Sequence, residues 1–194
     1  MKTSSWVWIG VGVIVLILLL TLLGTYNGLV GADENVNKTW ANVQTAYQRR
    51  ADLIPNLVET VKGYRDYEAA TLTKIVGLRS EAGKAKVNID SATTPEQLQA
   101  ASGQLDSVLS RLLLIVEQYP DLKASQNFLG LQDELAGTEN RVKVERDNFN
   151  EAVRDYNVKV RKFPSNIVAG WFGFNVRTNF QADAGAEKVV KVEF

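Results

Sequence analysis

The chain has 194 residues, and its 22 basic and 22 acidic residues cancel, so no single-sign field is present to attract nucleic acid. It contains neither cysteine nor histidine, which excludes disulfides, thiol or imidazole catalysis and metal sites built from these residues. Only four prolines are present, and the composition, rich in alanine, leucine and long charged side chains, favours helices over sheets.

An uninterrupted apolar segment, residues 6–23, reads WVWIGVGVIVLILLLTLL. As a helix it would be about 27 Å long, close to the roughly 30 Å hydrocarbon core of a bilayer. A cleaved signal peptide is the alternative, but its apolar region would be shorter, about 7–15 residues. We therefore predict a retained transmembrane anchor within residues 1–25, followed at the interface by Tyr26. The anchor residues that we single out are Trp6, Trp8, Ile14, Leu18 and Leu23.

The charges that flank this segment suggest an orientation. Lys2 and the free amine precede it, whereas Asp33 and Glu34 are the first charges after it. Because positive charge favours the cytoplasmic side, the sequence predicts a cytoplasmic N-terminus and an extracytoplasmic helical domain.

Apolar residues then recur with a period near 3.6, which predicts an amphipathic helix. Pro55 interrupts this stripe, removing a backbone donor and crowding the carbonyl of Ala51. The stripe stays in phase across the proline, which favours a kink over a break. The stripe consists of Val36, Trp40, Val43, Tyr47, Ala51, Ile54, Val58 and Val61.

The helical pattern runs on from Leu57 toward Leu78 and fades at Gly83. Residues 88–94 are expected to form a connection. Thr94-Pro95-Glu96-Gln97 predicts a helix start, with threonine as N-cap, proline in the first turn and glutamine three residues after the cap. Tyr119-Pro120 is expected to end that helix.

The last helix is predicted from Leu122 to Phe163 and, if continuous, would be about 63 Å long. Phe163-Pro164 ends it. Two seam positions, Thr138 and Glu145, are polar. They either lie at the bundle edge or pair within it, or they fix the register between helices. The predicted fold is all-α: a transmembrane helix followed, over residues 26–164, by a long antiparallel bundle of three to four helices.

Residues 165–194 form an apolar tail that differs in kind from the bundle. Residues 166–174 read NIVAGWFGF, and we expect them to fold back over one end of the bundle, because such a patch is rarely left exposed. Docking onto lipid or a partner is the alternative. Near the C-terminus Val190, Val192 and Phe194 alternate, which is compatible with a short strand or with capture by a peptide-binding domain.

Charge is unevenly distributed along the chain. Basic and acidic residues number 9 and 5 over residues 38–86, 2 and 8 over 87–140, and 7 and 4 over 141–163. Neighbouring helices of one fold would complement one another in this way. The alternative is that the same complementarity acts between subunits.

The chain resembles the LemA family of bacterial membrane proteins over nearly its whole length. The motifs that carry the resemblance are YNGLV at Tyr26–Val30, the run Trp40–Tyr64 with its core QRRADLIPNL, Tyr119–Leu122, Gly137–Arg141, Tyr156–Asn157 and Phe163–Pro164. The resemblance implies a single-pass protein of the bacterial inner membrane with an extended helical domain. Family genes often lie beside those of membrane metalloproteases or TPM-domain proteins, and some members are named for effects on cell-surface signalling.

The family signature also indicates candidate site residues. Arg49, Arg50 and Asp52 precede the proline by about one turn, so we expect Asp52 to pair locally with the arginines and Glu139 and Arg141 to complete a network across the bundle. This cluster either stabilises the kink or binds an anionic partner or a neighbouring subunit. The full set of structural or interaction candidates is Tyr26, Asn27, Trp40, Arg49, Arg50, Asp52, Pro55, Asn56, Glu139, Asn140, Arg141, Tyr156 and Asn157.

No phosphate-binding loop, nucleophile motif or acidic cluster is present in the sequence, so we expect no enzymatic activity, no cofactor and no metal. The sequence favours a membrane-anchored scaffold that forms homo-oligomers. The alternative is an adaptor for a membrane protease or a signalling receptor. A sensor with a pocket between its helices is a third class.

Overall fold

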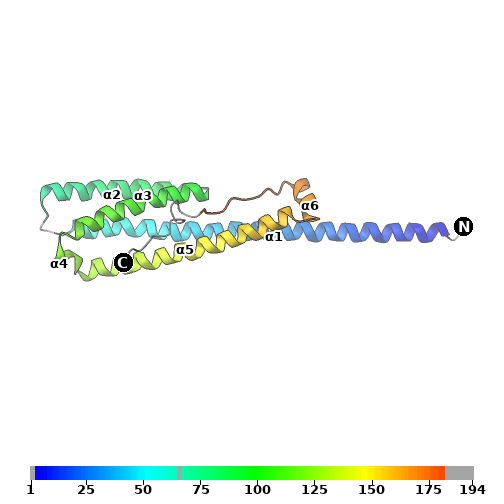
Figure 1. The fold of residues 1–194 in the computed structure, drawn as a ribbon, viewed down its shortest axis with the longest axis horizontal. Coiled ribbons are helices and arrows are strands. Elements are labelled where there is room, and N and C mark those ends of the chain that lie inside the picture. Colours follow the sequence, from blue (N-terminus) through cyan, green and yellow to red (C-terminus); the bar gives the residue numbers. More distant parts are fainter. Residues whose placement is uncertain (1–2, 65–66, 182–194) are drawn as a thin grey trace, which may run out of the picture. The chain divides into compact units, whose positions relative to one another are not determined.

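The computed structural model describes residues 3–64 and 67–181, with side chains from Trp6 onward. These ranges contain six helices and no strand, which confirms the all-α prediction (Figure 1). The chain divides into two compact units, Met1–Trp40 with Phe149–Thr178, and Ala41–Asn148 with Asn179–Phe194. The helices are α1 (Thr3–Lys62), α2 (Ala69–Asp90), α3 (Pro95–Val116), α4 (Pro120–Lys123), α5 (Gln126–Arg161) and α6 (Ser165–Phe172).

Helix α1 is a single helix of 60 residues that continues through Pro55, so the proline does not break it. Within the described part of the chain, α1 is the one helix long and apolar enough to cross a membrane, and none of its apolar window is buried. The core helix of a water-soluble domain can be equally apolar, but it is covered by other elements. The exposure of residues 6–23 therefore favours a lipid environment.

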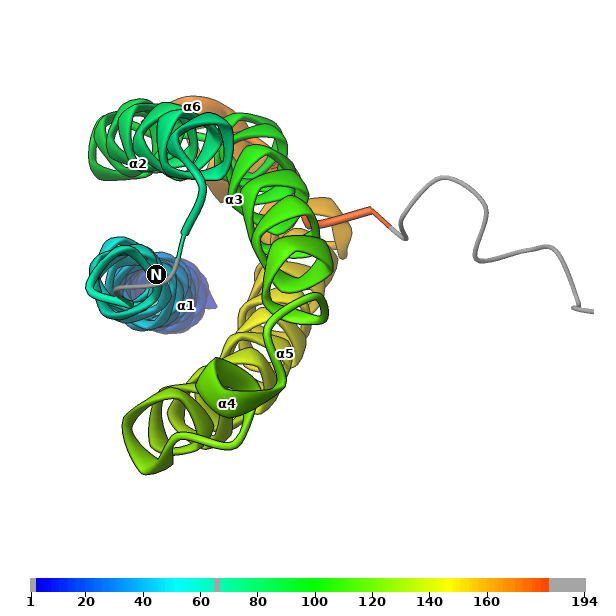
Figure 2. The same ribbon diagram turned by 90° about the vertical axis from the view of Figure 1, so that its left-hand side faces the viewer.

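In the second unit, helices α2, α3 and α5 follow one another in an arc on one side of α1 (Figure 2). The apolar stripe predicted for α1 faces this core, where Val43, Ala51 and Ile54 are fully buried. The other helices contribute mainly Ile75, Ile89, Leu98, Leu105, Leu112 and Phe128, each almost inaccessible to solvent.

The predicted start of α3 is confirmed. The hydroxyl of Thr94 accepts a hydrogen bond from the backbone N–H of Gln97, and Pro95 occupies the first turn. The side chain of Gln97 reaches back to the backbone N–H of Thr93, at 2.9 Å, rather than to that of Thr94. The cap therefore supplies acceptors for the N–H groups of Thr93 and Gln97, which have no carbonyl acceptor inside the helix.

The helical pattern toward Leu78 is interrupted, because α1 ends at Lys62 and α2 begins at Ala69. At the end of α1, the N–H of Tyr64 bonds to the carbonyl of Val61, which tightens the last turn after Gly63. The apolar pattern did not predict the end of α1 at Lys62, because apolar residues before and after it face the same core.

The connection expected at residues 88–94 is shorter in the structure, because α2 extends to Asp90. After Leu78, the buried face of α2 consists of Ala82, Ala85 and Ile89. Alanine gives a weak hydrophobic signal but has the best helix propensity, so the pattern faded at Gly83 while the helix continued.

The expectation of one helix from Leu122 to Phe163 is wrong at its beginning. The short α4 ends at Lys123, and α5 begins at Gln126 and is about 54 Å long at 1.5 Å per residue. Ala124 and Ser125 separate the two helices, and the Ser125 hydroxyl accepts a hydrogen bond from the N–H of Phe128, as an N-cap residue does.

In the first unit, the apolar tail folds back only in part, because Ile167, Trp171 and Phe172 stay exposed. Val168 and Ala169 of α6 are buried with Leu29 of α1, and Leu22, Tyr26, Val160 and Phe174 pack against this cluster. Gly173 ends α6 in the left-handed conformation, with φ of 77°, which glycine adopts without steric cost. The alternating residues Val190, Val192 and Phe194 lie outside the described residues.

We predict that Thr94→Ala lowers the free energy of unfolding by about 1 kcal/mol, because the Gln97 N–H loses its acceptor. Thr73→Ala is a matched control, since Thr73 is exposed inside α2 and its hydroxyl bonds only to the Ala69 carbonyl one turn back. Urea unfolding of both variants checks this. Equal midpoints for the two would show that the cap does not stabilise α3.

Three tyrosine rings, those of Tyr64, Tyr67 and Tyr119, contact one another edge to face where α1, α2 and α3 end or begin. The Tyr119 hydroxyl lies 3.5 Å from that of Thr71, whereas the buried Tyr67 hydroxyl has no hydrogen-bond partner among the described residues. Burial, with smaller contributions from Tyr119 and Tyr64, raises the pKa of Tyr67 from 10.0 to about 12.

This raised pKa makes stability depend on alkaline pH. The contribution of neutral Tyr67 is complete below pH 10.0 and is lost as the pH rises toward about 12, because the unfolded chain releases the proton first. We expect Tyr67→Phe to flatten this decline and to leave stability near neutral pH unchanged or slightly higher. Unfolding measured across this pH range, with Tyr119→Phe as control, checks this; an unchanged decline would contradict it.

Candidate functional site

The two arginines of the signature occupy different environments in the second unit. Arg50 is buried and lies in the seam of α1, where its Nη2 atom is 2.8 Å from Oδ1 of Asp106 in α3 and 3.8 Å from Oε2 of Glu139 in α5. Arg49 is 71% exposed and pairs with Glu134 of α5 at 3.4 Å. Arg50 therefore joins three helices, whereas Arg49 joins two at the surface.

The expected pairing of Asp52 with the arginines is wrong. Asp52 pairs instead with Lys86 of α2, at 2.7 Å, and Lys86 also lies 3.2 Å from Asp90. Residues two apart on a helix point to different sides, so Asp52 cannot share the environment of Arg50. The hydrogen bond to Asp52, followed by that to Asp90, raises the pKa of Lys86.

The expected network across the bundle is half correct. Glu139 joins Arg50, but Arg141 does not, because it lies two residues further along α5. Arg141 pairs with Glu145 one turn on, at 3.3 Å, and the Glu145 carboxylate also accepts a hydrogen bond from Asn148. Glu145 is buried, and both of these partners lie on its own helix. Thr138 is also buried, and its hydroxyl donates a hydrogen bond to the Leu135 carbonyl of the same helix at 2.7 Å.

Several of these ion pairs join the basic segment 38–86 to the acidic segment 87–140. Arg50 bonds to Asp106 and Glu139, and Arg49 to Glu134. This agrees with the interpretation that neighbouring helices of one fold complement each other in charge.

A surface groove of about 480 Å³ runs between α1 and α5 beside this cluster. Its floor contains small side chains, and its charged residues are two arginines and two glutamates. Among the described residues, the groove is lined by Asn42, Thr45, Ala46, Arg49, Glu134, Gly137, Thr138, Arg141 and Glu145. Asn56 and Asn140 are exposed and lie outside this lining, and Pro55 is half-buried in α1.

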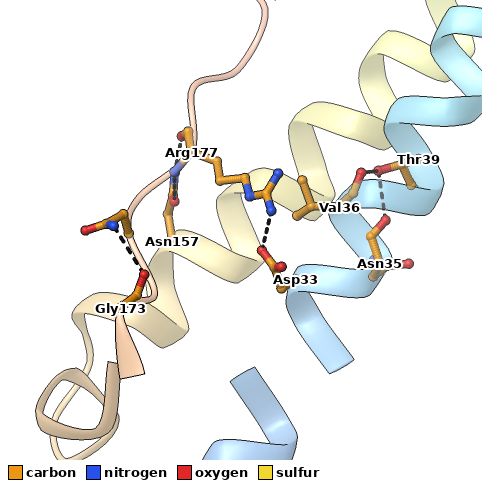
Figure 3. Close-up of polar contacts among 8 residues, drawn as sticks. Asp33, Asn35, Val36, Thr39, Asn157, Gly173 and Arg177 are labelled. Atoms are coloured by element: carbon orange, nitrogen blue, oxygen red, sulfur yellow. Dashed lines mark hydrogen bonds and ion pairs between the residues drawn. The ribbon is translucent and has the colours of Figure 1, made fainter. Parts of the chain in front are cut away.

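The remaining signature residues lie in the first unit and hold the segment that follows α6. The Asn157 side chain accepts a hydrogen bond from the Arg177 N–H and donates one to its carbonyl, both at 2.9 Å (Figure 3). The Arg177 guanidinium bonds to Asp33 of α1 at 2.7 Å and lies over the ring of Tyr156. Asn157 and Arg177 therefore fasten this segment to α5 and α1.

Burial, and next the charge of Asp33, raises the pKa of Tyr156. Elsewhere in this unit Trp40 packs on Phe149, with ring centroids 5.3 Å apart, and Tyr26 packs on Phe172, at 4.7 Å. Asn27 is exposed.

Sequence reasoning missed Arg177 and Asp106 as partners of signature residues. The Tyr156-Asn157 motif was identified as part of the family resemblance, without an indication of its partner. No pattern in the sequence points to Arg177, because its segment has neither a helical nor a strand period.

We predict that Asp106→Ala destabilises the chain by about 1–3 kcal/mol, because the buried Arg50 loses its nearer carboxylate. Glu134→Ala is the matched control, since it removes the partner of the neighbouring but exposed Arg49 and should cost less than about 1 kcal/mol. Chemical unfolding of both variants measures the difference. Equal losses would contradict the distinct roles of the two arginines.

A model of the LemA family matches residues 39–194. The chain is 30% identical over 147 residues to Protein LemA of Metamycoplasma hominis, covering 76% of this chain and 64% of that protein. It is 27% identical over 180 residues to Magnetosome protein MamQ 2 of Paramagnetospirillum magneticum, covering 83% of this chain and 66% of that protein.

A third relative, Magnetosome protein MamQ of Magnetospirillum gryphiswaldense, is 27% identical over 173 residues, with coverage of 79% and 64%. The chain thus spans a little under two thirds of the length of these curated relatives. The family match extends over most of the chain and includes the signature around Arg50, which lies in the seam between the helices. The chain belongs to the LemA family.

Proposed function

We propose that this chain is a non-enzymatic helical scaffold that is anchored in the bacterial inner membrane and assembles there with copies of itself, its helical part lying outside the cytoplasm. The observation that carries the proposal is the exposed apolar window of α1. The same helix continues into the wall of the groove through Asn42, Thr45 and Arg49. One element therefore carries both the anchor and a surface available to a partner.

The charges of the groove support self-assembly. Arg49 and Arg141 are 71% and 73% exposed, and each has a glutamate partner within the chain at more than 3 Å. The Arg49–Glu134 pair is exposed on both sides, and such pairs contribute only about 0–1 kcal/mol, so a second copy can replace either partner at little cost. The pair of Arg141 differs, because its partner Glu145 is buried. A face that carries arginine and glutamate in equal number can pair with a second copy of itself across a two-fold axis.

The second candidate function is that of an adaptor, in which a helix of a membrane protease or receptor occupies the groove. The open, partly polar groove between α1 and α5 favours it, since an amphipathic helix can lie in such a depression. The two candidates differ in what the purified protein does alone: a scaffold assembles, whereas an adaptor stays monomeric until its partner is added.

We expect light scattering of the detergent-solubilised full chain to give a discrete mass above the 21.5 kDa of one copy, after subtraction of detergent. Arg49→Glu should shift the mass toward that of the monomer. The double variant Arg49→Glu with Glu134→Arg should restore the mass of the assembly, because it swaps the two charges and keeps an opposite pair. Arg154→Glu is the matched control: Arg154 is 69% exposed and pairs with Glu151 at 3.4 Å, away from the groove.

A monomer at every protein concentration would overturn the scaffold and leave the adaptor. An assembly that Arg49→Glu and Arg154→Glu weaken equally would retain the scaffold and exclude the groove as its interface.

A further inference from the structure

The short helix α6 has two unlike faces. Its inner face is buried in the first unit, where Val168 and Ala169 pack with Leu29 of α1. Its outer face presents Ile167 and Trp171, which are four residues apart and 44% and 70% exposed. Phe163, four residues before Ile167 and just ahead of the helix, is 75% exposed. The outer face is thus an apolar patch that no described segment covers.

This patch lies beside the end of the apolar segment of α1. Leu22, which precedes the last residue of that segment, and Tyr26 both pack against the cluster formed by Val168, Ala169 and Leu29. At 1.5 Å per residue, Leu29 lies only about 9 Å beyond Leu23 along the helix axis. The interfacial layer of a bilayer is roughly 5–8 Å thick on each side of the hydrocarbon core. Tyr26 lies about 4.5 Å beyond Leu23 on the same scale, inside this layer, and Leu29 lies at its outer edge, so in a bilayer spanned by residues 6–23 α6 would lie at the depth of the lipid headgroups.

The direction and charge of α6 fit the same location. In Figure 1 the helix lies across α1 rather than alongside it, as a helix in the membrane plane would beside a spanning helix. Arg161 and Lys162 are exposed and lie four and three residues before the first residue of α6. Tryptophan and phenylalanine on one face, with cationic residues close by, are typical of helices that bind the surface of anionic bilayers.

We propose that α6 is a second membrane contact, lying in the headgroup layer with Phe163, Ile167 and Trp171 inserted into the bilayer. This inference rests on the proposed anchoring of residues 6–23. The chain then touches one membrane twice, once across it and once along its surface. The second contact fixes the depth of α1 and its rotation about its own axis, which a lone spanning helix leaves free.

The test uses three full-length variants that each keep one of the tryptophans at positions 8, 40 and 171 and carry phenylalanine at the other tryptophan positions. Each is reconstituted in vesicles of phosphatidylcholine and phosphatidylglycerol, with or without bromine on the acyl chains. Bromine quenches tryptophan fluorescence only at short range. Far-ultraviolet circular dichroism confirms that each variant keeps its helices.

We expect strong quenching of Trp8 and of Trp171, the latter greatest with bromine near the headgroup, and none of Trp40, which packs on Phe149 well beyond the span. Quenching of Trp8 without quenching of Trp171 would overturn the second contact and retain the anchor. No quenching of Trp8 would instead contradict the anchoring itself. If Trp171 is shielded from bromine and its emission depends on protein concentration, a second copy covers the patch and the lipid contact is wrong.

A charge placed on the outer face gives a second readout. In the chain that keeps Trp171, Ile167→Asp should shift its emission to longer wavelength and reduce its quenching, because the carboxylate resists insertion. Val176→Asp is the matched control: Val176 is 50% exposed, close to the value for Ile167, but follows the end of α6. Equal effects of the two substitutions would contradict a contact specific to the outer face.

Discussion

The whole structure depends on a change along α1 from a helix that is apolar on every side to a helix with a single apolar face. Over residues 6–23 the large apolar side chains other than Leu22 are exposed on all sides of the helix. From Leu29 onward the buried positions follow one stripe, which includes Val36, Val43 and Ile54. A helix that is apolar all round needs lipid, whereas a one-sided helix needs other helices. α5 and α6 cover the stripe in the first unit, and α2, α3 and α5 in the second.

Arg50 lies in this stripe, between the buried side chains of Tyr47 and Ile54. A guanidinium in such a seam is costly unless acids neutralise it, and here they come from two other helices, through Asp106 and Glu139. Helix α1 thereby selects an arrangement in which α3 and α5 both present a carboxylate at one level. Apolar packing alone would tolerate other rotations of these helices, so the ion pairs contribute specificity more than stability.

The helices could be predicted from the sequence wherever a local signal was sufficient. The apolar period indicated α1, and Thr94-Pro95 and Tyr119-Pro120 marked the two ends of α3, because caps and prolines act within one turn. The end of α1 at Lys62 and the break between α4 and α5 near Ser125 were not predicted. The helical spacing of apolar residues continues across both points, so the pattern gave no sign of them. Gly63 and Ser125, the residues found at these two points, are of types that also occur inside helices, so neither predicts a helix end.

The candidate site was less predictable, because pairing depends on which helix lies beside which. The sequence motifs identified Arg49, Arg50 and Asn157 as candidate site residues, but they did not identify the residues that these three contact. Asp52 was nearest to the arginines in the sequence yet faces Lys86, while Asp106 and Arg177 are distant in the sequence and close in space. Helix geometry alone excludes the local pairing, but only the tertiary fold supplies the distant one.

The position of Arg50 has a consequence for the order in which the chain can fold as it is synthesised. Arg50 is made early, Asp106 much later and Glu139 later still, so its charge stays without its final partners until α5 has formed. A compact intermediate of α1, α2 and α3 would supply only the first of the two acids. The pairing of Arg50 with both acids is therefore complete only once α5 has joined the other helices.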